Sequence, residues 1–103
     1  MGPYDLTYRL RGTAKALGEV AEHLASGRAE CNRQADVANT LEQVWLLVGG
    51  LSELLGYQAG ALPEMTSDRG APAAGRLIEE AAAAAAKLGE QLRGAGEAVR
   101  NVR

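Results

Sequence analysis

The sequence has no phenylalanine, and its aromatic side chains are one Trp and three Tyr, only 4% of the 103 residues. All-β sandwiches normally use many β-branched and aromatic side chains, so this shortage disfavours a β-sheet protein. About one residue in five is Ala, the residue with the highest helix propensity. Apolar residues make up 47% and charged residues 23%, which is the balance of a folded chain. We therefore expect one all-α domain that spans residues 1–103.

Cysteine and histidine each occur once, as Cys31 and His23. This excludes a disulfide framework and a zinc site built on several cysteines. We interpret His23 as a surface histidine beside Glu19 and Glu22, since a metal site would need ligands from other helices. Cys31 is interpreted as an ordinary small residue at the start of a helix, with a reactive thiol as the alternative.

Known catalytic motifs are also missing from the sequence. There is no His-Glu-x-x-His, no Gly-x-Ser-x-Gly and no glycine loop followed by Lys-Ser or Lys-Thr. Gly94-Ala-Gly96 lies inside a helical pattern and follows no strand, so it does not indicate a dinucleotide site. We expect no enzymatic activity, no catalytic residue, no cofactor, no metal and no small-molecule substrate.

The charge is small and unevenly distributed. The formal net charge is −2; residues 31–68 contribute −4, and residues 69–103 contribute +2. Proteins that coat nucleic acid are usually strongly basic, so general nucleic-acid binding is disfavoured. The most apolar stretch, Trp45 to Leu51, is much shorter than the roughly twenty residues of a membrane span. The N-terminus does not resemble a signal peptide, and we expect a cytoplasmic protein without membrane contact.

Apolar residues recur with alternating spacings of three and four in three segments, the pattern of helices that pack along a seam. The first helix is expected over about residues 4–26, with Pro3 in its first turn and Ser26-Gly27 as its stop signal. The second is expected over about residues 30–60, and Gly49-Gly50 marks either close packing or a kink in its middle. The two seams are Leu6, Leu10, Thr13, Leu17, Val20, Leu24 and Val37, Leu41, Val44, Val48, Leu51, Leu55.

The third helix is expected over about residues 72–101, after a Pro-containing loop at about residues 61–71. The glycines of its last third weaken the C-terminal end. A mean spacing of 3.5 residues favours shallow helix crossings, so we expect an up-down-up three-helix bundle. The third seam is Ile78, Ala81, Ala85, Leu88, Leu92, Ala95, Val99, Val102.

The second helix has a broader apolar face than one seam requires, and such helices usually contact more than one neighbour. Trp45 is interpreted either as a core residue or as an anchor for a partner, since Trp is enriched at interface hot spots. Tyr4 and Tyr8, one turn apart, fit either the edge of a core or a binding surface. The candidate interface residues are Trp45, Leu46, Leu47, Leu51, Leu54, Tyr4 and Tyr8.

Three stretches resemble a group of small uncharacterised Ala- and Leu-rich helical proteins of actinomycetes. They are Tyr4-Asp-Leu-Thr-Tyr-Arg-Leu10, Asp36-Val-Ala-Asn-Thr-Leu41 and Gly96-Glu-Ala-Val-Arg-Asn-Val102. The resemblance implies an association with mobile genetic elements and assigns no activity to any residue.

Three functional hypotheses follow from these patterns. The first is a non-enzymatic helical bundle that acts by association, as a homo-oligomer or as a subunit of a larger assembly. The second is an accessory factor of a DNA transfer or maintenance system, with the basic third helix near nucleic acid. The third is an export substrate like those of type VII secretion, although the Trp-x-Gly and C-terminal Tyr-x-x-x-Asp/Glu signals of that group are missing.

Overall fold

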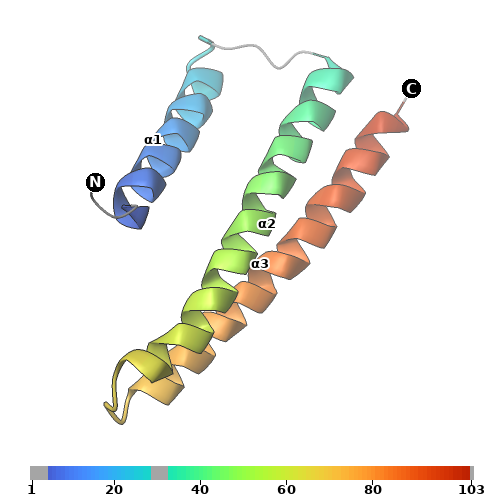
Figure 1. Ribbon diagram of the computed structural model, residues 1–103. Helices are drawn as coiled ribbons and strands as arrows, with labels where there is room; N and C mark the ends of the chain where they lie inside the picture. Colours follow the sequence, from blue (N-terminus) through green and yellow to red (C-terminus); the bar gives the residue numbers. More distant parts are fainter. Residues whose placement is uncertain (1–4, 29–32, 103) are drawn as a thin grey trace. The chain divides into compact units, whose positions relative to one another are not determined.

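The computed structural model describes residues 5–28 and 33–102, and within them it contains three α-helices and no strand. They are α1 (Leu6–Ala25), α2 (Gln34–Met65) and α3 (Ala71–Arg100), shown in Figure 1. The predicted all-α class is confirmed. The chain divides into two compact units, residues 1–32 with α1 and residues 33–103 with α2 and α3. The place of the first helix in the predicted three-helix bundle stays a prediction.

The boundaries of α1 follow from local hydrogen bonds at its two ends. The Asp5 carboxylate accepts a hydrogen bond from the backbone N–H of Tyr8 at 3.0 Å and so caps the N-terminus. After Ser26, Gly27 adopts a φ of +76°, the left-handed conformation that glycine favours at a helix end. The predicted Ser-Gly stop is confirmed, whereas Pro3 and Tyr4 lie outside the described residues. Within its own unit, α1 is a single helix and buries none of its residues.

The first turn of α2 is held by hydrogen bonds from Arg33 to the side chain of Asp36. The Asp36 carboxylate accepts hydrogen bonds from the Arg33 backbone N–H at 3.2 Å and from its guanidinium at 3.1 Å. The hydrogen bond and the negative charge of Asp36 raise the pKa of Arg33.

The C-terminal end of α2 differs from the prediction, because residues 61–65 are helical and not part of a loop. Pro63 lies inside the last turns of the helix, where its ring packs beside Gly75 of α3, 3.3 Å from the position a Cβ would take there. A proline there removes one backbone hydrogen bond, and the packing against α3 offsets this loss. The loop is therefore only residues 66–70, and it is closed by a 2.7 Å hydrogen bond from the Gly70 N–H to the Asp68 carboxylate.

The two long helices run antiparallel and side by side in a hairpin, which we call the α2–α3 hairpin (Figure 1). Three contacts define its register. Trp45 lies against Gly89, with Cδ1 3.7 Å from the ideal Cβ position. The Ser52 hydroxyl donates to the Ala82 carbonyl at 3.1 Å, and nearer the loop the Ala59 carbonyl lies 3.1 Å from the ideal Cβ position of Gly75. At the open end, the Gln34 amide donates to the carbonyls of Val99 and Val102.

The core of the hairpin consists of very small side chains. The buried apolar residues are Ala38, Val48, Ala71, Ala82 and Ala85, and only Val48 is larger than Ala. On α3, the buried positions also include Gly75, Gly89 and Gly96. Small residues at heptad spacing let the two helix backbones approach closely, at the cost of little buried apolar area.

This close approach corrects part of the predicted seams; Val48 of the second seam and Ala85 of the third are buried as predicted. The predicted third seam used Ala81, Leu88 and Ala95, whereas the buried residues are their neighbours Ala82, Gly89 and Gly96. The prediction that the glycine pair of α2 allows close packing is also wrong. Gly49 and Gly50 lie inside a continuous helix, and an added Cβ would meet nothing within 4 Å at either position. The helix–helix contact selects small residues on α3 facing larger ones on α2, a choice that spacing alone does not reveal.

Two glycines of α3 should respond differently to a methyl group. At Gly89 an added Cβ would make ordinary contact with Trp45, whereas at Gly75 it would lie 3.1 Å from the Ala59 carbonyl oxygen, which is backbone and cannot move aside easily. We expect Gly89→Ala to be more stable than Gly75→Ala by about 1 kcal/mol or more, because only the former gains helix propensity without crowding. Urea denaturation followed by circular dichroism measures the difference, and equal midpoints would contradict the described contact.

Candidate protein interface

One side of the α2–α3 hairpin is apolar along both helices. On α2 the stripe lies beside the row that contacts α3, and on α3 the matching stripe lies beside the row that contacts α2. Because the helices are antiparallel, these two stripes fall on the same side of the hairpin. We call this surface the apolar face; it comprises Val37, Val44, Leu47, Leu51 and Leu54 of α2 and Leu77, Ala81, Ala84, Leu88 and Ala95 of α3.

The apolar face is accessible and uncharged. Leu47 is 39% exposed, Leu51 41% and Leu88 44%. Thr40 and Gln91 lie between the apolar members of the two stripes, and no Asp, Glu, Lys or Arg occurs in either stripe. Single exposed apolar residues are common on protein surfaces, but a contiguous row on two adjacent helices is typical of an interaction site.

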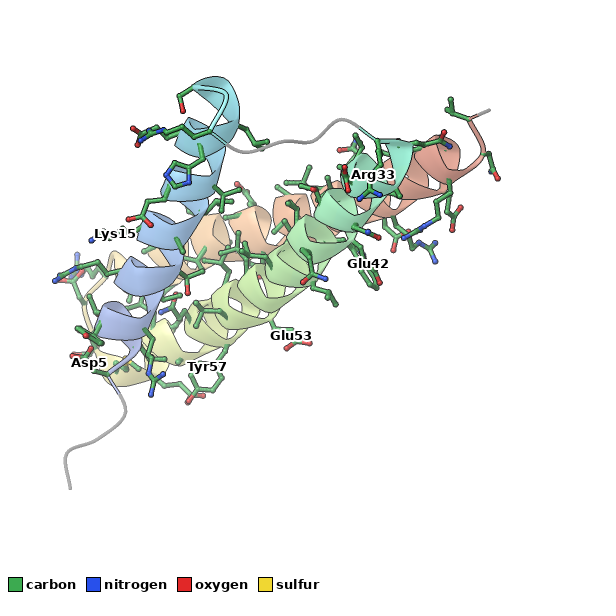
Figure 2. All side chains as sticks on the ribbon, turned by 90° about the horizontal axis from the view of Figure 1, so that it is seen from above. Asp5, Lys15, Arg33, Glu42, Glu53 and Tyr57 are labelled. Carbon is green, nitrogen blue, oxygen red and sulfur yellow. The ribbon has the colours of Figure 1, made fainter. Side chains whose placement is uncertain are left out.

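The opposite side of the hairpin is polar. Arg100 of α3 pairs with Glu42 of α2 at 3.4 Å, and Arg93 pairs with Glu90 at 3.2 Å. Glu53 projects outward from α2 away from α3, as Figure 2 shows. The hairpin therefore has one charged side and one apolar side, so it is amphipathic as a unit.

The predicted interface residues divide between these surfaces. Leu47, Leu51 and Leu54 lie together on the apolar face. Trp45, 38% exposed, packs against Gly89 at the contact between the two helices. Leu46, 55% exposed, points away from α3 and away from the apolar face.

The two predicted tyrosines lie off the apolar face or outside the described residues, and two leucines of α3 were not predicted. Tyr8 lies on α1 and is 70% exposed, while Tyr4 lies outside the described residues. The interface prediction omitted Leu77 and Leu88 of α3. Leu88 did occur in the predicted third seam, so the signal was present but was assigned to the core of a single chain.

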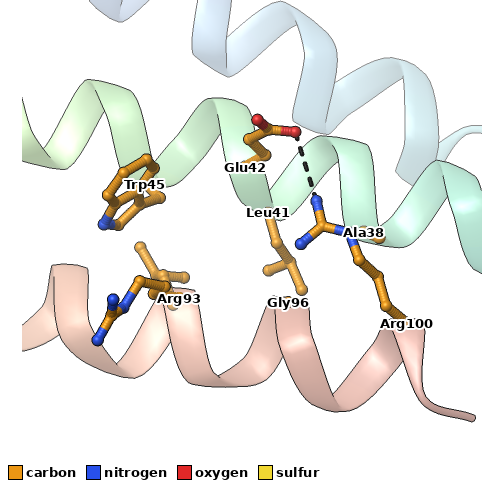
Figure 3. Close-up of a pocket in the computed structure, with 8 residues that line it drawn as sticks. Ala38, Leu41, Glu42, Trp45, Arg93, Gly96 and Arg100 are labelled. Carbon is orange, nitrogen blue, oxygen red and sulfur yellow. Dashed lines mark hydrogen bonds and ion pairs between the residues drawn. The ribbon is translucent and has the colours of Figure 1, made fainter.

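A shallow hollow of about 120 Å³ lies on the polar side, between the two helices (Figure 3). It forms because Ala38 and Gly96 leave space between Trp45 and Arg100. The two arginines at its rim are each paired with a carboxylate, so the hollow has no unpaired charge directed into it by those residues. Its chemistry does not specify a ligand.

Within residues 5–28 and 33–102, no three of the His, Cys, Asp and Glu side chains are grouped closely enough to bind a metal ion. His23 is an exposed residue of the last turn of α1, and Cys31 lies outside the described residues. In the same ranges, no helix combines the length and the apolar character required to cross a bilayer. No family model, curated protein or solved structure matches this chain.

Proposed function

We propose that this protein is a non-enzymatic binding module that acts by association through the apolar face of the α2–α3 hairpin. The observation that carries the proposal is the uncharged stripe that both helices present on one side. Its α2 part runs from Val37 to Leu54, about 26 Å at the helical rise of 1.5 Å per residue. A surface of this shape fits one or two partner helices laid along it.

The energetics of the hairpin support the same conclusion. A core of alanines and one valine stabilises only weakly, because hydrophobic stabilisation scales with the apolar area removed from water. Units of about seventy residues with small cores usually gain further stability from oligomerisation or another added constraint. Covering Leu47, Leu51 and Leu88 would supply the burial that the α2–α3 contact lacks.

The charge of the hairpin supports association over the alternative in which α3 contacts nucleic acid. Residues 33–102 carry six cations and nine carboxylates, a net charge of −3. Proteins that bind the phosphate backbone are usually strongly basic.

Photo-crosslinking tests the proposal with two adjacent residues. Leu47 lies on the apolar face, and its neighbour Leu46 points elsewhere although it is more exposed. A photoreactive amino acid at position 47 is expected to give a specific covalent adduct in cells that express the protein. The same amino acid at position 46 is the matched control and is expected to give at least ten-fold less.

Adducts of any defined mass that form at position 47 but not at position 46 would support association through this face. Adducts at neither position, or equal yields at both, would overturn the proposal. The mass of the adduct is measured by gel electrophoresis and mass spectrometry, and it also reports which partner is bound.

A further inference from the structure

We draw no further inference here: the strongest candidate, the apolar face of the α2–α3 hairpin on which Leu47, Leu51 and Leu88 are exposed, belongs to the site already described, and nothing in the structure shows what covers it.

Discussion

Val48→Asp is expected to lower the free energy of unfolding by about 3–5 kcal/mol and to leave the α2–α3 hairpin largely unfolded. Val48 is 5% exposed and is the largest member of the hairpin's buried core. An aspartate there would place a carboxylate at the buried contact with Gly89, and a buried charge is among the most destabilising changes known. The loss is comparable to the whole stability of a small domain.

Leu46→Asp is the matched control for this experiment. It introduces the same charge on the same helix two residues away, at a side chain that is 55% exposed. Its unfolding free energy should lie within about 1 kcal/mol of the parent value. Thermal and urea denaturation followed by circular dichroism measure both variants, and similar losses in the two would contradict the described orientation of α2.

The double variant Gly49→Ala, Gly50→Ala is expected to be more stable than the parent by about 2 kcal/mol. Both glycines lie in the middle of α2, and an added methyl would meet no atom within 4 Å. Each substitution gains about 1 kcal/mol of helix propensity, mainly because alanine loses less conformational entropy on folding. The urea midpoint should rise without a change in the slope of the transition.

Gly27→Ala provides the opposite control for the glycine series. Gly27 also has open space around its Cβ position, but its φ of +76° is a conformation that alanine adopts poorly. It should therefore bring no gain and a small loss of helicity in α1. A double variant at residues 49 and 50 that is no more stable than the parent would indicate that α2 is not a continuous helix there.

The sequence by itself determined the helices and most of their ends. The lack of Phe, the abundance of Ala and the seven-residue periodicity favour helix by local propensity, which depends little on the rest of the fold. The stop at Ser26-Gly27 was predictable for the same reason, because the left-handed conformation of Gly27 is a local event. The end of α2 was not, because Pro63 is a local helix breaker that a neighbouring helix accommodates.

Only the tertiary structure decided which residues of each stripe are buried. Leu88 and Gly89 are adjacent, and hydrophobicity favoured Leu88 for the core, but Gly89 is the residue that lies against Trp45. Close packing depends on the fit between two surfaces, and the smallest residues on α3 allow the nearest approach to α2. The same fit leaves Leu47, Leu51 and Leu88 exposed on one side, so the candidate interface is a product of how the two helices pair and not of either helix alone.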